Sequence, residues 1–322
     1  MRLLTFVLQG SDNKTASIGA LKDDNTVLDL QKAYQAKYNG AAAYFNDMIS
    51  FLDSFAEAKK MAEQLLTEGC NDAEYKLAEV KLLAPVPRPR SIRDCSTFSG
   101  HLTNIAIVRR MRAGMKREDI NIEECKPAKM WYKYPPYYMG NTNSVVGPDS
   151  KITYPVGETL RDYELEIGCY IGKAGKMITE ERALDHVAGF TIFNDCSARA
   201  FQFEETSGRH LGPCRGKHFD TGNVMGPYLV TADEFNIQKA SGTVKVNGEV
   251  WGECNTRDSY VSLEYLIAYL SKDMTLYPGD FIGLGTLTNG TALEHNRVLN
   301  DGDVVEMEIT GLGRLVTTVA KS

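Results

Sequence analysis

The chain has 322 residues, so it can form one large domain or two unequal domains around a sizeable core. Apolar residues make up 43% and charged residues 24%, proportions of a globular protein that exclude a large disordered one. The 36 Lys and Arg residues against 42 Asp and Glu residues give a net charge of −6, which argues against a nucleic-acid partner. No apolar run approaches the roughly 20 residues of a membrane span, so we expect no membrane partner.

The cysteines and the first residues bear on the cellular compartment. The seven cysteines are an odd number and include no Cys-x-x-Cys, so neither a disulfide framework nor a zinc site is expected. Residues 1–8 (MRLLTFVL) are too short for a signal peptide and lack a small-residue cleavage site. We therefore expect a cytoplasmic location.

Residues 1–84 are predicted to form a small N-terminal domain. Apolar-rich strands are expected at 3–8, 16–21 and 26–30, with polar turns between them. Within 41–68 apolar residues recur every three or four positions, which is typical of amphipathic helix. Residues 84–90 (APVPRPR) hold three prolines within five positions, which neither a helix nor a central strand accommodates, so we interpret them as a linker.

Residues 85–322 are predicted to form a larger domain that is rich in strands. Strands are expected at 162–172, 243–251, 280–285 and 304–309, and helices at 99–113, 179–187, 196–205 and 261–271. Because the strands outnumber the helices and do not alternate regularly with them, this pattern favours an α+β fold over a doubly wound parallel sheet.

Two glutamates in the first of these strands are candidate metal ligands. Side chains alternate along a strand, so Glu164 and Glu166 point to one face about 7 Å apart, where they can converge on a hard cation. A solvated strand face is the commoner explanation of such a pair. Glu306 and Glu308 have the same spacing, and nothing else nearby indicates a site.

Further acidic and basic residues lie at predicted element ends. Asp195 follows the apolar run 187–193 and precedes a predicted helix, and Arg199 and Gln202 would share its helix face. The alternative is an N-cap aspartate with an i, i+4 ion pair. Asp94 and His101 come just after the proline segment, where they could equally be a turn residue and an ordinary helix histidine.

Taken together, these segments resemble the fumarylacetoacetate hydrolase family over most of residues 85–318. The motifs occur in the family's order, and the full set is too specific to arise by chance. They are Asp94 and His101, an aromatic-rich loop that ends in Tyr138-Met139-Gly140, Glu164 and Glu166, Asn-Asp-x-Ser-Ala-Arg at 194–199 with Gln202, Gly-Lys-x-Phe-x-Thr at 216–221, and Met-Thr-Leu-x-Pro-Gly-Asp at 274–280 followed by Gly285-Thr286.

The resemblance implies a fold and a cofactor. The catalytic domain of this family is a mixed β-sandwich or roll, usually dimeric, and larger members add a small β-rich N-terminal domain. The resemblance also implies a site for Mg²⁺, with Mn²⁺ or Ca²⁺ as alternatives, held by Asp94, Glu164, Glu166 and Asp195. An all-oxygen ligand set suits a hard cation and not zinc. Four such carboxylates without a cation would repel one another and have raised pKa values.

The resemblance further implies a reaction, namely hydrolysis of a carbon–carbon bond in an acylpyruvate or other 1,3-diketo acid. The alternatives are a lyase or isomerase on the same fold, that is a 2-oxo acid decarboxylase, a sugar-acid dehydratase or a dienoate isomerase, or a non-catalytic member with a structural metal. His101, oriented by Glu294, would activate water, and Lys217 would stabilise developing negative charge. Substrate contacts are expected from Arg199, Gln202, Tyr138 and Thr286, with ion pairing to the carboxylates equally open for Arg199.

Three residues depart from the family pattern. Ser96 stands where the family hydrolase has a tyrosine, and Asn141 where it has an arginine, and both of those residues contact the remote end of the substrate. Their loss predicts an acyl group other than that of fumarylacetoacetate, and a less anionic one. Leu287 follows Gly285-Thr286, where the family usually has proline.

Overall fold

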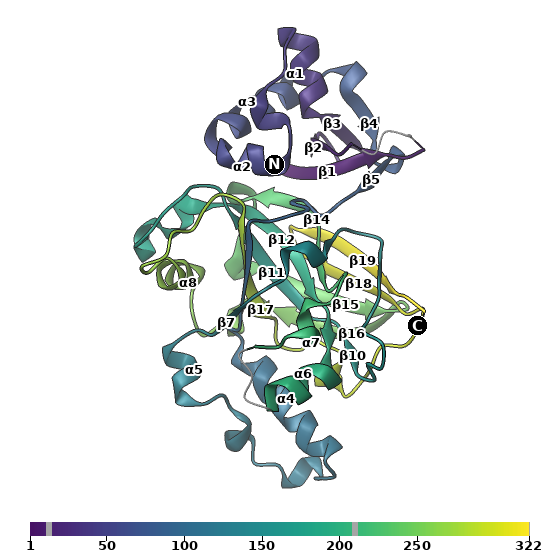
Figure 1. Cartoon of the computed structure of the whole chain (residues 1–322), viewed down its shortest axis with the longest axis vertical. Coiled ribbons are helices and arrows are strands. Elements are labelled where there is room, and N and C mark those ends of the chain that lie inside the picture. Colours follow the sequence, from purple (N-terminus) through teal and green to yellow (C-terminus); the bar gives the residue numbers. More distant parts are fainter. Residues whose placement is uncertain (11–14, 208–211, 322) are drawn as a thin grey trace.

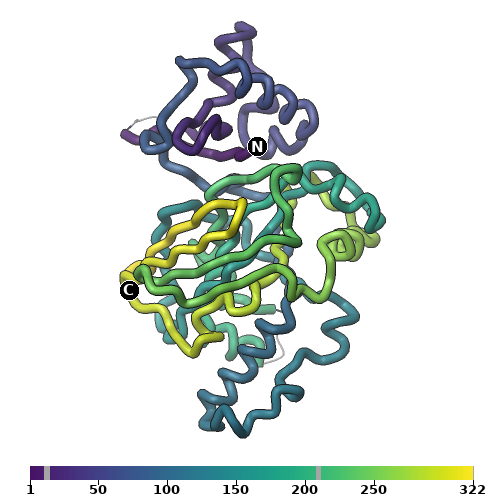
Figure 2. The backbone as a smooth tube through the Cα atoms, turned by 180° about the vertical axis from the view of Figure 1, so that it is seen from behind, coloured from purple at the N-terminus to yellow at the C-terminus, as the bar shows by residue number. Residues whose placement is uncertain are grey.

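The computed structural model describes residues 1–10, 15–207 and 212–321. Figure 1 shows the N-terminal helices at one end of the molecule, a strand-rich body in the middle and the helical stretch 99–133 toward the other end, and Figure 2 shows the same order from behind. No helix in these described ranges is long and apolar enough to cross a membrane. The fold is a mixture of α and β structure dominated by one large sheet.

The first 82 residues alternate short strands with helices. The predicted strands are confirmed, and the amphipathic segment 41–68 is helical but broken, because Ser54 leaves the helical conformation between two helices. Asp47 caps the first of these two helices by accepting a hydrogen bond from the Ser50 amide at 2.7 Å. The elements are β1 (Arg2–Leu8), β2 (Ser17–Leu21), β3 (Thr26–Asp29), α1 (Leu30–Tyr38), α2 (Met48–Asp53), α3 (Phe55–Glu68), β4 (Glu74–Lys76) and β5 (Val80–Leu82).

The N-terminal strands extend the main sheet of the body. Strand β1 pairs antiparallel with β14 (Asn223–Thr231), with Arg2 opposite Val230 and Leu3 opposite Leu229. One hydrophobic cluster also spans the junction, since Leu3 and Phe51 belong to the same cluster as Phe193. The division into 1–84 and 85–322 stays a prediction.

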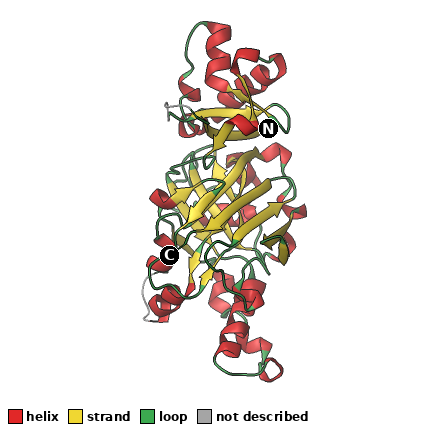
Figure 3. Cartoon of the chain, turned by 90° about the vertical axis from the view of Figure 1, so that its right-hand side faces the viewer, coloured by secondary structure: helices red, strands yellow, loops and turns green. Residues whose placement is uncertain are grey.

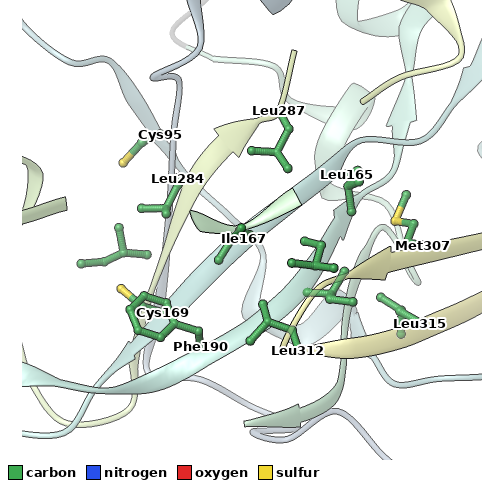
Figure 4. Packing of buried hydrophobic residues seen from close by; sticks show 14 of the residues in the cluster. Cys95, Leu165, Ile167, Cys169, Phe190, Leu284, Leu287, Met307, Leu312 and Leu315 are labelled. Atoms are coloured by element: carbon green, nitrogen blue, oxygen red, sulfur yellow. The ribbon is translucent and has the colours of Figure 1, made fainter. Parts of the chain in front are cut away.

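The body consists of two sheets that enclose the larger core. The main sheet continues from β14 through β12 (Val187–Asp195), β11 (Leu165–Ile171), β17 (Asp280–Thr286), β6 (Ser91–Cys95) and β7 (Tyr137–Met139). The second sheet contains β16 (Glu249–Asn255), β15 (Ser241–Val246), β18 (Val304–Ile309), β19 (Gly313–Val319) and β9 (Ser150–Ile152). Ile167 and Phe190 of the main sheet lie in one cluster with Met307 and Leu315 of the second (Figure 4). This arrangement confirms the β-rich α+β fold.

Three predicted elements have different boundaries. The expected strand 243–251 is wrong, because Asn247 and Gly248 adopt positive φ angles of 51° and 82° and join β15 and β16 as a hairpin. The expected strand 162–172 is divided into β10 (Arg161–Asp162) and β11, so Glu164 lies between them. The helix expected from 196 is α6 (Arg199–Ser207), because Ser197 and Ala198 form strand β13 against β10.

The remaining helices surround the body. Helix α4 (Ser99–Arg112) confirms the helix expected there, and the chain between it and α5 (Lys129–Lys133) forms the projection at the lower end of the molecule in Figure 1 and Figure 3. Helix α7 (Arg215–His218) follows α6, and α8 (Leu263–Leu270) matches the helix predicted from 261. The segment 179–187 is the 3₁₀ helix η7 (Glu180–His186), η11 (Leu293–His295) lies near α4, and β8 (Val145–Val146) pairs with β14.

Candidate active site

Three buried carboxylates from neighbouring strands meet at one end of the main sheet. Asp94 lies in β6, Glu166 in β11 and Asp195 at the end of β12. Each offers a ligand oxygen, and these oxygens all lie within 4.8 Å of one another. Strand β17 runs between β6 and β11, and its glycine at position 283 leaves the space into which Asp94 and Glu166 project.

The environment of these carboxylates fits a divalent cation. The Oδ1 atoms of Asp94 and Asp195 are buried and have no hydrogen-bond partner among the described residues. Burial, followed by the charge of neighbouring carboxylates, raises the pKa of Asp94 and Glu166 well above the usual range. Burial also raises the pKa of Asp195, although Lys217 acts in the opposite direction. Oxygen ligands with unpaired acceptor atoms are what Mg²⁺, Mn²⁺ or Ca²⁺ requires.

The glycine at position 283 provides a test of the cluster that removes no carboxylate. A Cβ atom there would lie 2.4 Å from Asp94 Oδ1 and 3.3 Å from Glu166 Oε2, so one of them has to move. We expect Gly283→Ala to weaken Mg²⁺ binding at least about tenfold in isothermal titration calorimetry, because small displacements of ligands and their supports cost 10- to 100-fold in affinity. Gly40→Ala is the control, since its added Cβ would meet one atom, at 3.9 Å. Unchanged affinity in Gly283→Ala would show that Asp94 does not hold the cation.

Glu164 lies beside this cluster, but its oxygens face cations. Arg199 Nη2 lies 2.6 Å from Glu164 Oε1, and the ammonium of Lys217 contacts both Glu164 and Asp195. Burial acts to raise the pKa of Glu164, but the charges of Arg199 and Lys217 and the hydrogen bond from His101 outweigh it and hold the pKa well below the usual range. The structure thus brings three of the four predicted ligands together, and metal ligation by Glu164 stays a prediction.

Arg199 is held by an aspartate that the sequence analysis did not single out. Its Nε donates to Asp162 Oδ2 at 2.8 Å, and its Nη1 donates to Gln202 Oε1 at 3.0 Å. Asp162 is buried, and its other oxygen accepts hydrogen bonds from the amides of Ala292 and Leu293. The sequence contains a pattern that could have indicated this residue, because Asp162, Glu164 and Glu166 occupy every second position. It was missed because only the Glu-x-Glu pair was considered.

His101 and Glu294 meet as the sequence analysis expected. His101 Nδ1 lies 3.1 Å from Glu294 Oε2, which is within ion-pair distance, but the two groups are not aligned for a hydrogen bond. Its Nε2 lies 3.5 Å from Glu164 Oε1. Glu294 is itself fixed by Asn104 Nδ2 at 3.1 Å and the Asn289 amide at 3.0 Å. Burial acts to lower the pKa of His101, but Glu294 and Glu164 outweigh it and raise the pKa to about 9.

The predicted substrate-binding residues line a cavity of about 500 Å³ with the carboxylates at one side. Two of them also support the cluster, because Tyr138 donates to Asp195 Oδ2 at 2.8 Å and Thr286 Oγ1 donates to Glu166 Oε1 at 3.1 Å. Gln202 and Arg199 line the same cavity. One pocket is therefore lined by carboxylates, cationic side chains and an imidazole. The contacts of these residues with a substrate remain predictions.

A family model matches the part of the chain that holds most of this site. The model described as fumarylacetoacetate (FAA) hydrolase C-terminal matches residues 103–320. The chain belongs to the fumarylacetoacetate hydrolase family. The matched segment includes Glu164, Glu166 and Asp195, while Asp94 and His101 lie just before it. The resemblance inferred from the sequence motifs is therefore confirmed. The proteins that this chain resembles include several that are named as enzymes.

Proteins similar to this chain are named for different reactions. A Xenopus laevis protein named mitochondrial oxaloacetate tautomerase fahd2 is 32% identical over 324 positions, which cover 99% of this chain and 90% of that protein. The crystal structure of maleylpyruvate hydrolase from Sphingobium sp. SYK-6, in complex with manganese(II) and pyruvate, has a TM-score of 0.72 at 22% identity over 99% of both chains. A 5-carboxymethyl-2-hydroxymuconate delta-isomerase from Mycobacterium smegmatis has a TM-score of 0.69 at 20% identity over both full chains. The two structures share the fold.

Proposed function

We propose that this chain is a divalent-cation-dependent hydrolase that cleaves a carbon–carbon bond in an acylpyruvate or other 1,3-diketo acid. The observation that supports it is the contact of His101 with the buried carboxylate of Glu294 at 3.1 Å, because His101 lines the same pocket as Asp94, Glu166 and Asp195. Mg²⁺ is the proposed cation, with Mn²⁺ or Ca²⁺ as alternatives, and a homodimer is the proposed assembly.

The residues have distinct proposed roles. Asp94, Glu166 and Asp195 would hold the cation, with Glu164 as the fourth proposed ligand. A bound divalent cation supplies Lewis-acid polarisation of the oxygens of a 2-oxo acid. Glu294 holds Nδ1 of His101. Because the pKa of His101 is raised to about 9, its Nε2 takes a proton from the water that attacks the distal carbonyl carbon only in the deprotonated form of the imidazole, which alkaline pH favours. Lys217 supplies positive charge beside the negative charge that develops on the substrate.

A second candidate is keto–enol tautomerisation of the same class of acid. The observation that favours it is the named activity of the Xenopus laevis relative, which aligns with nearly the full length of this chain. Tautomerisation breaks no carbon–carbon bond and needs only proton transfer, in which carbon gains a proton and the enol oxygen loses one. His101, with a pKa raised to about 9, is a proton donor of that kind.

One experiment separates these reactions. The Mg²⁺-loaded protein is incubated in H₂¹⁸O with 2,4-dioxo acids and with enol oxaloacetate, and the products are identified by mass spectrometry and NMR. We expect pyruvate together with a carboxylic acid that carries one ¹⁸O atom, and no turnover in EDTA. Accelerated conversion of the enol to keto oxaloacetate without cleavage establishes the tautomerase, and release of CO₂ establishes a decarboxylase. The absence of any turnover overturns the proposal.

A further inference from the structure

The contacts of five residues in and behind the pocket close into a ring. Arg199 Nη2 donates to Glu164 Oε1 at 2.6 Å, and the same oxygen lies 3.5 Å from His101 Nε2. Nδ1 of this imidazole in turn lies 3.1 Å from Glu294 Oε2. Asp162 connects the two ends of this series, because one of its oxygens accepts from Arg199 and the other from the backbone of the turn that carries Glu294.

The two oxygens of Asp162 bind different elements. Its Oδ2 accepts from Nε of Arg199, the first residue of α6, at 2.8 Å. Its Oδ1 accepts from the amides of Ala292 and Leu293 at 2.8 Å and 3.3 Å, at the point where η11 begins. A side chain that satisfies the free amides at the start of a helical turn fixes that end of the turn. Asp162 therefore holds α6 and η11 in one arrangement.

Asp162 lies behind the pocket wall and not in the pocket. It is 1% exposed, and it is not among the described residues that line the cavity of about 500 Å³. Its backbone is fixed as well, because β10 pairs with β13 and its carbonyl oxygen accepts from the Tyr154 hydroxyl at 2.6 Å. Any effect of Asp162 on a reaction therefore passes through the side chains and the turn that it binds.

The connection needs both oxygens of the carboxylate. An ionised carboxylate has only acceptors, and Arg199 and the backbone amides have only donors to offer it. An asparagine has one acceptor oxygen and one NH₂ donor, so it can serve either Arg199 or the amides, and a donor then faces a donor on the other side. Asp162→Asn therefore opens the ring in either orientation and keeps the volume of the side chain.

We propose that Asp162 is a positioning residue, which ties Arg199 to the turn of Glu294 and so fixes the imidazole that lies between them. The inference rests on the proposed function, because that function assigns proton transfer to His101. The imidazole contacts a carboxylate on each side, so its place depends on both elements that Asp162 holds. A small misplacement of a reacting group costs about 100-fold in rate, so a residue that touches no substrate can still control turnover.

Steady-state kinetics of the Mg²⁺-loaded protein test this role. We expect Asp162→Asn to lower kcat for a 2,4-dioxo acid about 10- to 100-fold, while KM and the Mg²⁺ affinity change less than about threefold. A loss that falls on KM alone overturns the proposal, because it would place the effect on substrate binding.

A second buried aspartate provides the matched control. Asp280 accepts from the Tyr277 amide at 2.9 Å and lies 3.4 Å from Nη1 of Arg93, so it also joins an arginine to a backbone turn. It begins β17, whose other end, Thr286, lies at the carboxylate cluster. We expect Asp280→Asn to keep kcat within about twofold, with both variants assayed well below their melting temperatures.

A double-mutant cycle separates positioning from a general loss of structure. If Asp162 acts through His101, both substitutions remove the same contribution, and the loss from Asp162→Asn should shrink to less than about threefold in the His101→Ala background. A variant that only disturbs the fold costs the same factor in both backgrounds. Equal losses in the two backgrounds would therefore show that Asp162 does not act through the imidazole.

Histidine NMR supplies a measurement that needs no turnover. The chain has five histidines, and in ¹⁵N-histidine-labelled protein the His101 ring signals are those missing from His101→Ala. We expect Asp162→Asn to shift them in the same direction as Glu294→Gln does, and Asp280→Asn to leave them unchanged. If the protein processes no oxo acid but the shifts occur, the proposed function fails and the support of His101 by Asp162 stands. If it hydrolyses 2,4-dioxo acids while Asp162→Asn changes neither kcat nor these signals, the positioning role fails and the proposed function stands.

Discussion

The variant Glu166→Gln should lose Mg²⁺ binding and at least about 1,000-fold in turnover, equivalent to roughly 4 kcal/mol of transition-state stabilisation by the cation. The substitution is nearly isosteric, and the local hydrogen bonds can be kept. The remaining amide oxygen can accept from the Gly285 amide, which now donates to Glu166 at 3.1 Å. The new NH₂ group can donate to Thr286, because a threonine hydroxyl also accepts hydrogen bonds. Loss of function would then report the missing charge and not a disturbed fold.

The chain contains a matched control for this variant. Glu306 has the same Glu-x-Glu spacing, but it lies in β18 and pairs with the exposed Arg314 at 2.9 Å. Mg²⁺ should raise the melting temperature of the unmodified protein and of Glu306→Gln, because a ligand that binds only the folded state stabilises it. Glu166→Gln should show no such rise. An unchanged Mg²⁺ affinity in Glu166→Gln by calorimetry would exclude the carboxylate cluster as the cation site.

Strand alternation predicted part of the carboxylate cluster. It predicted that Glu164 and Glu166 share one face, and the family resemblance grouped them with Asp195. The structure brings Glu166 and Asp195 together because the start of β11 pairs with the end of the antiparallel strand β12. Strand alternation did not predict that Glu164 lies before the strand begins and contacts Arg199 and Lys217. Those cations come from α6 and α7, whose packing depends on loops with no periodic pattern, so spacing along the chain does not determine it.

The alternative interpretation of Asp195 also failed because local spacing does not determine where a helix begins. Its alternative role as a helix cap required the helix to begin beside it, but β13 intervenes and α6 starts at Arg199. The first turn of α6 is capped by Glu158, which accepts hydrogen bonds from the Ala200 and Phe201 amides at 3.1 Å and 3.3 Å. This residue is some 40 positions earlier in the chain, so no local motif could indicate it.

The contact between His101 and Glu294, in contrast, was predicted from the sequence. They are 193 positions apart, and the pairing was inferred from family resemblance and not from any local pattern. The structure shows the physical basis of the contact, because η11 packs against α4 and the two asparagines that bind Glu294 fix its carboxylate. A motif can thus identify both partners of a contact whose geometry only the assembled fold supplies.

His101→Ala should reduce hydrolysis about 100- to 10,000-fold, the usual contribution of a positioned general base, while Mg²⁺ affinity changes less than about threefold. Glu294→Gln should have a smaller effect of the same kind. Its Oε1 can still accept from the Asn104 side chain and the Asn289 amide, but an NH₂ group would then face Nδ1 of His101. That arrangement favours the tautomer with the proton on Nε2, which is the wrong form for taking a proton from water.

The neighbouring histidine provides the control that makes this result decisive. His295 directly follows Glu294, is exposed, and has its Nε2 3.1 Å from the Asn289 backbone oxygen, so His295→Ala perturbs the same 3₁₀ helix without touching the pair. We expect His295→Ala to retain hydrolysis within about twofold. If His101→Ala also retains it while Glu166→Gln abolishes it, water is not activated by His101, and the hydrolase interpretation gives way to a lyase or isomerase. If His101→Ala abolishes enol loss without any carbon–carbon cleavage in the parent protein, the pair serves tautomerisation.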